Sequence, residues 1–338
     1  MDSITQIALG AAFGEVTVGH KAGKKGAIWG AVLGTLPDLD VIANLFLDPV
    51  ASLAAHRAAT HSFPVVLLAS PFIGFALKRL HAKEKVTYLE WVFMVFLVLG
   101  THIFIDLLTV YGTQIFWPIT NHPFSIDSIF IIDPLYTIPL GLGVILALLQ
   151  KVGSKKRFRI NAAGLIISTL YLTWGMSVKL FVHSSFKQGL ASRGIQTERV
   201  MTAPTPFNTV LWQGLAIDQD TLRAGLYSVL DQRLPRTFQG IPRQSHLLDG
   251  HRDDRAVKRL LWFSKGWYAL EEDSLGLRFV DYRFGRSDSW LEEDGSPIFH
   301  WRLIPDSTGA YTSFQQLPTL FTARGDAFGE LFERAKGE

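Results

Sequence analysis

The chain has 338 residues, of which 48% are hydrophobic, with no cysteine and a formal net charge of +3. A mean hydropathy of +0.20 is too apolar for an ordinary water-soluble protein of this length. The lack of cysteine excludes thiolate metal sites, disulfides and a cysteine nucleophile, so any metal ligands must be nitrogen or oxygen atoms. The basic residues cluster between apolar segments, where membrane topology explains them better than nucleic-acid binding, which we do not expect.

Apolar segments dominate the first half of the chain and predict about six membrane helices. They are Ile4–Val18, Gly26–Leu36, Phe63–Leu77, Trp91–Val110, Pro134–Leu149 and Ala162–Val182. The first three fall short of the roughly 20 residues that a perpendicular span needs. After Val182 the composition changes to mixed charge, glycine and proline. We therefore predict an α-helical integral membrane domain over residues 1–183 and a soluble α+β domain over residues 184–338.

Lysine and arginine are unevenly distributed among the loops. Basic residues follow the first, third and fifth apolar segments, whereas residues 111–133 contain none and residues 37–62 contain only Arg57. The positive-inside rule places the basic loops in the cytoplasm. Six spans then put both chain ends, and the whole domain 184–338, on the extracytoplasmic side of the cytoplasmic (inner) membrane.

The second domain contains short runs of aromatic and branched residues that predict strands. These runs are Arg259–Tyr268, Leu277–Phe284 and Ile298–Leu303, and Phe328–Ala335 predicts a short terminal helix. Ser184–Pro206 is the expected linker between the domains.

Glycines recur in the first two apolar segments. Gly10 and Gly14 lie four residues apart on one segment, and Gly26, Gly30 and Gly34 have the same spacing on the next. Such spacing lets two helix backbones approach closely, so we interpret these glycines as packing residues with no direct role in chemistry.

Ionisable side chains inside apolar segments are costly, so their presence indicates function. His102 and Asp106 are four residues apart, which places both on one helix face. Pro37 should interrupt the second helix and let Asp38 and Asp40 point into a cavity at a similar depth, roughly 18 Å from the inner helix end. Taken alone, the first pair could be a hydrogen-bonded structural pair and the second a helix cap.

Two histidines, His56 and His61, precede the third segment on the outward side. Five residues do not span one helix face, so a loop or turn must bring them together, either as two metal ligands or as a ligand and a proton shuttle. Arg57 suits bidentate contact with a substrate phosphate or carboxylate, or alternatively anchors lipid headgroups. Asp133, directly before Pro134, is either a helix cap or a further ligand.

Together these side chains predict a site for one or two divalent metal ions, with Zn²⁺ as the expected metal. The predicted ligands are Asp38, Asp40, His56, His61, His102, Asp106 and Asp133. The predicted catalytic residues are Asp40, as general base, His56 and Arg57.

Four short motifs, in the same order and context, resemble the YdjM family of membrane-bound proteins described as metal-dependent hydrolases: Met1-Asp2-Ser3-Ile4-Thr5, Pro37-Asp38-Leu39-Asp40, His56-Arg57 with Thr60-His61-Ser62, and His102 with Asp106. Further similarity at residues 112–118 and 132–136 extends to long-form members with a C-terminal domain, so the resemblance covers nearly the whole chain. It implies a membrane-embedded hydrolase with these residues at its metal site. Gln6 departs from the pattern, because many relatives have histidine there.

That family is distantly similar to zinc-dependent phospholipase C and P1-type nucleases, through His102 and Asp106. The chain has no counterpart of their later His-x-x-x-Glu pair, so the resemblance implies one or two metal ions rather than three.

We therefore expect a membrane-bound metal-dependent hydrolase that cleaves a phosphoester of a lipid or other amphiphilic substrate with metal-activated water. The alternative is a transporter that carries protons or metal ions through the same His/Asp cluster. A third interpretation is a structural metal site, with the domain 184–338 binding a cell-envelope partner.

Overall fold

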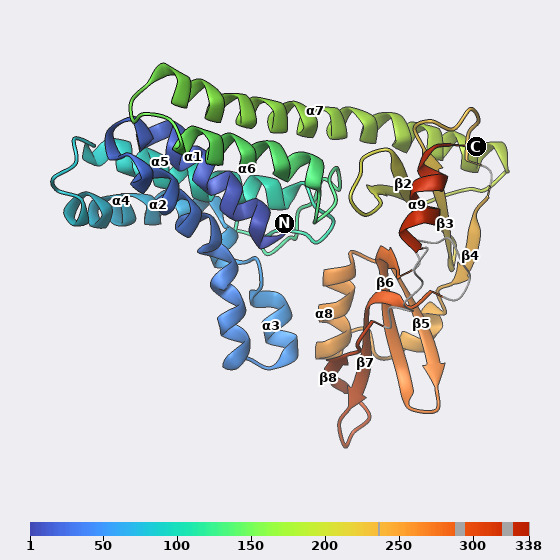
Figure 1. Cartoon of the computed structure of the whole chain (residues 1–338). Coiled ribbons are helices and arrows are strands. Elements are labelled where there is room, and N and C mark those ends of the chain that lie inside the picture. Colours follow the sequence, from blue (N-terminus) through green and yellow to red (C-terminus); the bar gives the residue numbers. More distant parts are fainter. Residues whose placement is uncertain (236, 288–294, 320–326, 338) are drawn as a thin grey trace. The chain divides into compact units, whose positions relative to one another are not determined.

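The computed structural model describes residues 1–235, 237–287, 295–319 and 327–337, and Figure 1 shows its elements along the chain. The chain divides into two compact units. Unit 1 comprises Met1–Phe46 and Ala55–Gly175, and unit 2 comprises Leu47–Ala54 and Met176–Glu338. Unit 1 is helical and unit 2 contains two antiparallel sheets, so the predicted order of a helical region followed by an α+β region is confirmed.

Unit 1 is built around α1, which packs against α2, α5 and α6. The interior of the unit is apolar, with Trp91, Met94 and Ile103 of α5 fully buried. The elements of unit 1 are α1 Ser3–Ala22, α2 Lys24–Thr35, η1 Pro37–Leu45, η2 Ala59–His61, α4 Phe63–Leu80, α5 Tyr88–Leu107, α6 Pro134–Leu148 and the first part of α7 Lys155–Ser192. Helix α3 Pro49–Ala55 belongs to unit 2 except for its last residue.

The expected count of about six membrane helices is not supported. Within the described residues, α4, α5 and α7 are long and apolar enough to cross a membrane, and α2 with η1 makes a fourth span if the two, bent by 42°, are counted as one. The 15 residues of α6 reach only roughly 22 Å, against a hydrocarbon core of roughly 30 Å. Helix α1 carries a buried glutamate and several glycines, and it packs against other helices.

Helices α1 and α2 pack backbone against backbone. A Cβ atom on Gly10 would lie 2.2 Å from the Gly30 carbonyl oxygen, and one on Gly14 would lie 2.1 Å from that of Gly26. Any side chain at these positions would push the helices apart, so the predicted packing role of the glycines is confirmed.

Helix α7 continues into unit 2 as one uninterrupted helix of 38 residues. Val178, Val182, Phe186 and Leu190, spaced by four residues, form a buried core with Trp212 of the first sheet. The predicted boundary at residue 183 therefore falls inside a helix. The expected linker Ser184–Pro206 instead contains the end of α7 and strand β1.

Unit 2 contains two four-stranded sheets, each with its strands in sequence order and every neighbouring pair antiparallel. The predicted strands at 277–284 and 298–303 lie within β6 and β7, and the predicted terminal helix corresponds to α9 Ala327–Ala335. The strands are β1 Arg199–Pro204, β2 Leu211–Asp218, β3 Thr221–Ser228, β4 Gln239–Pro242, β5 Tyr268–Asp273, β6 Gly276–Arg286, β7 Pro297–Pro305 and β8 Tyr311–Gln316.

The prediction of a strand at Arg259–Tyr268 was wrong. Most of this run belongs to helix α8 Arg255–Ser264, which follows the short helix η3 Ser245–Leu248. Ala256, Leu260 and Phe263 recur at helical spacing and are buried, so burial of one helix face outweighs the strand propensity of the aromatic residues.

We expect Gly30→Ala to lower the free energy of unfolding by about 3 kcal/mol, because the new Cβ would lie 2.0 Å from the Gly10 carbonyl oxygen and neither backbone can yield cheaply. Gly141→Ala on α6 is the matched control, since no atom lies within 4 Å of its added Cβ. Thermal unfolding in detergent measures both. Equal melting temperatures for the two variants would contradict the packing role of Gly30.

Candidate metal centre

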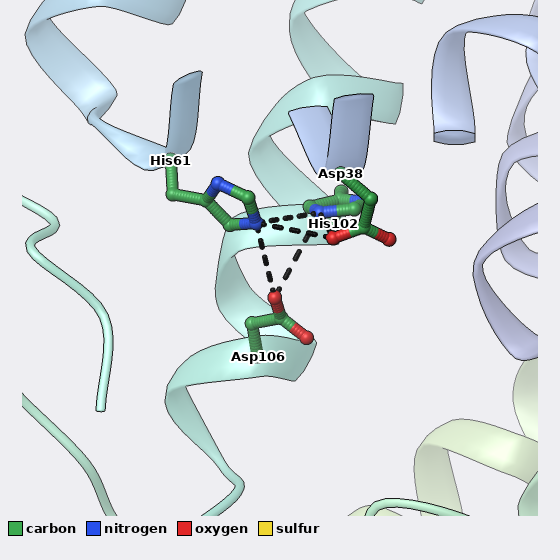
Figure 2. A group of neighbouring side chains, drawn as sticks. All are labelled: Asp38, His61, His102 and Asp106. Carbon is green, nitrogen blue, oxygen red and sulfur yellow. Dashed lines mark hydrogen bonds and ion pairs between the residues drawn. The ribbon is translucent and has the colours of Figure 1, made fainter. Parts of the chain in front are cut away.

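Four ionisable side chains from three segments distant in sequence converge in unit 1. Asp38 comes from η1, His61 from η2, and His102 and Asp106 from α5. Figure 2 shows the four side chains pointing toward one another. Each offers one ligand atom, and these atoms all lie within 4.8 Å of one another. This buried cluster, which we call the metal cluster, can hold a metal ion.

The spacing of the ligand atoms suits a single small cation. His61 Nε2 lies 3.1 Å from His102 Nε2, 3.2 Å from Asp106 Oδ2 and 3.4 Å from Asp38 Oδ1. His102 Nε2 lies 3.6 Å from Asp38 Oδ1 and 3.8 Å from Asp106 Oδ2. Ligands of a four-coordinate Zn²⁺ are separated by roughly 3.3 Å, so these distances need little adjustment.

A break in the chain places Asp38 in the metal cluster. Pro37 is the first residue of η1, and it ends the regular helix because its ring and missing N–H do not fit a helix interior. The side chain of Asp38 is 25% exposed, whereas those of His61, His102 and Asp106 are at most 1% exposed. Asp38 therefore forms the accessible edge of the metal cluster.

Both imidazoles are oriented by a hydrogen-bonding partner on the far side of the ring. His102 Nδ1 lies 2.8 Å from the carbonyl oxygen of Gly34, to which only a protonated nitrogen can donate. This assignment leaves the lone pair of His102 Nε2 directed at the metal cluster. On His61, Nδ1 lies 3.0 Å from Thr60 Oγ1 and 3.5 Å from Asp40 Oδ2, and Nε2 again faces the metal cluster.

Asp40 and His56, both predicted as metal ligands, lie beside the metal cluster and are not part of it. Asp40 Oδ1 lies 2.8 Å from His56 Nδ1, and Asp40 Oδ2 accepts hydrogen bonds from the Arg57 backbone N–H at 2.7 Å and from Thr60 Oγ1 at 3.3 Å. Asp40 thus ties the loop 56–60 to η1 and supports the ring of His61. Partners of this kind orient the ligands of a metal.

Arg57 is buried against the metal cluster. Its Nε lies 3.3 Å from Asp106 Oδ2, and its Nη1 donates to Thr109 Oγ1 at 3.3 Å. The guanidinium also lies 4.7 Å from the centre of the Tyr111 ring. Its backbone has φ +55°, a left-handed conformation that costs energy for a residue with a side chain and that often marks functional sites.

The contacts of Asp106 test whether the metal cluster suits a cation. Asp106 Oδ1 pairs with the amino group of Met1 and accepts a hydrogen bond from Gln6 Nε2 at 3.2 Å. Asp106 Oδ2 is buried and accepts no hydrogen bond of suitable geometry within the described residues, although Arg57 Nε and His61 Nε2 lie 3.3 and 3.2 Å away. Buried carboxylate oxygens are rarely left in this state, and a bound cation would satisfy it. Gln6, the position at which the chain departs from the family pattern expected from the sequence, here donates to Asp106.

Electrostatics at His61, which lies outside the spanning helices, also favour positive charge. Burial lowers the pKa of the His61 imidazole, but the carboxylates of Asp106 and Asp38 outweigh burial, so its pKa is raised above the usual value. The cluster thus attracts a proton, and a metal ion must displace it. Metal binding should therefore weaken as the pH falls.

Asp133, the remaining predicted ligand, lies outside the metal cluster. It caps α6 by accepting a hydrogen bond from the backbone N–H of Leu135 at 3.0 Å, and Tyr171 donates its hydroxyl to the other oxygen at 2.8 Å. Burial raises the pKa of its carboxyl. These contacts match the helix cap that the sequence left open as an alternative.

The supporting roles of three groups were not predicted from the sequence: those of the Gly34 carbonyl, the Thr109 hydroxyl and the hydroxyl of Thr60, a residue that had been named only as part of a motif. A main-chain carbonyl has no residue signature, so no motif could have indicated the partner of His102. Thr60 directly precedes His61 within a quoted motif, and Thr109 follows Asp106 by three positions, which was the only signal for Thr109.

Similarity to a known family supports a membrane location for the helical unit. The family model described as YdjM inner membrane protein matches residues 1–182, more than half of the chain. The uncharacterized protein YfhP of Bacillus subtilis (strain 168) is 30% identical over 141 residues, which cover 40% of this chain and only 42% of that relative. No solved structure matches. With the apolar helices, the family match supports association with the inner membrane.

We expect the purified protein to contain a divalent metal and the His102→Ala variant to lose it, because His102 Nε2 faces the centre of the metal cluster. His122→Ala, which removes an exposed loop histidine, is the matched control and should retain the metal. Elemental mass spectrometry of the folded, monodisperse proteins measures the content. A full metal complement in His102→Ala would contradict the site.

Asp40→Asn should weaken metal affinity about 10–100-fold, because Asp40 helps to orient the imidazole ring of the ligand His61. The variant should still bind the metal fully when the metal is saturating. Asp253→Asn, at a side chain that is 96% exposed, should leave the affinity unchanged. Competition with a chromophoric chelator measures both. Complete loss of metal in Asp40→Asn would instead make Asp40 a direct ligand.

Proposed function

The chain belongs to the YdjM inner membrane protein family, and we propose that it is a metal-dependent hydrolase that cleaves a phosphoester bond of a lipid or another amphiphilic molecule. One observation carries the proposal: a buried group of two imidazoles and two carboxylates has a guanidinium packed against it and one partly exposed edge. A structural metal site needs neither the guanidinium nor the exposed edge.

The ligand types favour Zn²⁺ as the metal, because borderline ions take imidazole and carboxylate together. When bound, such an ion would lower the pKa of a water molecule that it coordinates and would polarise a phosphoryl oxygen of the substrate. His61, His102 and Asp106, which are almost fully buried, would hold the ion, and Asp38, the fourth member of the metal cluster, would then be free to act on water. The side chain of Gln6 orients Asp106, and the Gly34 carbonyl orients His102.

We assign the general base to Asp38 rather than to Asp40, the residue favoured by the sequence. Both oxygens of Asp40 are engaged by His56, the Arg57 backbone and Thr60. Asp38 is the exposed member of the metal cluster, with its Oδ1 within 3.6 Å of both imidazoles. A carboxylate there can take the proton of an attacking water and release it to solvent.

Arg57 is the proposed phosphate-binding residue. Its Nε is buried and has no hydrogen-bond acceptor of suitable geometry within the described residues. A phosphoryl oxygen at the metal cluster would accept from this group, and a guanidinium suits phosphate geometry. The left-handed backbone of Arg57 and its contact with Tyr111 hold the guanidinium in position before substrate binds.

The surroundings of Asp38 support an amphiphilic substrate. Leu39, Val41, Ile42 and Leu45 of η1 are 48–79% exposed, which gives the segment that carries Asp38 an apolar surface suited to lipid. A substrate held in the membrane could thus reach the metal cluster without leaving it. We propose that this edge lies on the extracytoplasmic side, because Arg57 is the only basic residue within residues 37–62 and 111–133. Helix α7, which begins among the basic residues 151–159, would then carry the domain that follows it to the same side.

A transporter is the second candidate function. The break between α2 and η1 is the observation that favours it, because broken helices that expose ionisable groups also line the ion sites of transporters. Proteoliposomes distinguish the two functions: a transporter moves protons or metal ions without forming product, and a hydrolase forms product without flux.

We expect Asp38→Asn to lower the turnover number on a phosphodiester lipid about 10²–10⁴-fold while the metal content is retained, because the amide cannot accept the proton. His102→Ala should lose both activity and metal. A phosphodiesterase assay in mixed lipid and detergent, paired with elemental analysis, measures the two quantities. Full activity in Asp38→Asn would exclude the proposed base.

A further inference from the structure

A cavity lies between α1 and the start of α7, and none of its lining residues belongs to the metal cluster. It has a volume of about 440 Å³ and is lined by Glu15, Val16 and His20 of α1 and by residues 153–155, 157–159 and 161. Along α1, Glu15 lies nine residues after Gln6, which contacts Asp106, a separation of about 13 Å. The cavity is therefore a different site, and an inference about it does not depend on hydrolysis.

The cavity carries uncompensated positive charge. Glu15 is the only carboxylate in its lining, and Arg157 neutralises it through two hydrogen bonds of 2.6 and 2.7 Å in a buried pair. Lys155 and Arg159 are exposed, and neither forms an ion pair with a carboxylate in the part of the chain that the structure describes. Two positive charges thus line the cavity with no counter-charge.

A buried acceptor in the lining adds a second requirement. Asn161 is 1% exposed and donates its Nδ2–H to the Ala12 carbonyl at 2.8 Å. Its Oδ1 is buried and accepts no hydrogen bond within the described residues. Leaving a buried polar atom unpaired is costly, so this oxygen points to a ligand that brings a donor. A fully ionised phosphate brings none, whereas a headgroup hydroxyl does.

The surface next to the cavity suits hydrocarbon chains. Phe158, which lines the cavity, is 55% exposed, and Ile166, Ile167 and Leu170 further along α7 are 53–63% exposed. This helix is long and apolar enough to span a membrane. A ligand with a polar head in the cavity could therefore lay its acyl chains along α7.

From these features we propose that the cavity between α1 and α7 is a binding site for an anionic phospholipid whose headgroup carries hydroxyl groups. Lys155 and Arg159 bind the phosphodiester, and a headgroup hydroxyl donates to Asn161 Oδ1. The backbone N–H groups at the start of α7 add a favourable dipole for the phosphate. Basic pockets between membrane helices on the cytoplasmic side are suited to such headgroups.

The test measures binding of phosphatidylglycerol to the full-length protein in detergent by native mass spectrometry. The double variant Lys155→Gln/Arg159→Gln should bind roughly thirtyfold more weakly, since each basic residue near a lipid phosphate contributes a roughly fivefold effect. The double variant Lys151→Gln/Lys156→Gln removes the same charge from the same segment, outside the cavity lining, and should change the affinity less than about threefold.

Two further arms separate the lipid from other sources of phosphate. Phosphatidylcholine, which has no headgroup donor and no net charge, should bind much more weakly than phosphatidylglycerol, and millimolar inorganic phosphate should not displace the lipid. Equal weakening in the two double variants, equal binding of both lipids, or displacement by inorganic phosphate would each overturn the proposal.

Discussion

The helical unit depends on the burial of one carboxylate, Asp106. A charge in a membrane interior is tolerated only when other groups compensate it, and here four separate parts of the chain do so. The Met1 amino group and Gln6 contact one oxygen, while Arg57 and His61 approach the other. Because those groups come from the chain start, α1, the loop before η2 and η2 itself, compensation of Asp106 also specifies how these segments pack around α5. The chemistry of the site and the packing of the unit therefore have the same physical origin.

Two backbone features make this arrangement possible. The glycine-lined contact between α1 and α2 brings α2 close enough for its last turn to reach α5, where the Gly34 carbonyl meets His102. The break at Pro37, two residues after α2 ends, then turns the chain so that Asp38 faces the same point. Irregular backbone at membrane depth is stable only where its polar groups find partners or line a cavity. Here the Leu39 N–H donates to the Leu36 carbonyl, and the side chain of Asp38 contacts the imidazoles of His61 and His102.

The sequence predicted the four members of the metal cluster, because each stands out as an ionisable group in an apolar context. It could not tell these four ligands from Asp40, His56 and Asp133, because the direction in which each side chain points depends on its hydrogen-bonding partners, and residue type does not reveal those partners.

The predicted number of membrane helices was wrong for a related reason. Helices α1 and α6 are apolar because they pack in the unit, and hydropathy does not separate contact with other helices from contact with lipid. In unit 2, the runs of aromatic and branched residues predicted β6 and β7 correctly, whereas the aromatic residues of α8, which also have high strand propensity, led to a wrong strand prediction.

The acceptor that orients His102 is a main-chain oxygen, and this has a genetic consequence. A substitution at position 34 does not remove the peptide carbonyl. The tautomer of His102 therefore does not depend on any partner side chain that a mutation could delete. It is instead vulnerable to enlargement: a methyl group on Gly34 would lie 2.5 Å from the Gln6 carbonyl oxygen and would shift α2 as a body. Mutations that replace a glycine of the α1–α2 contact with a larger residue should therefore disrupt the metal cluster as readily as mutations of its ligands.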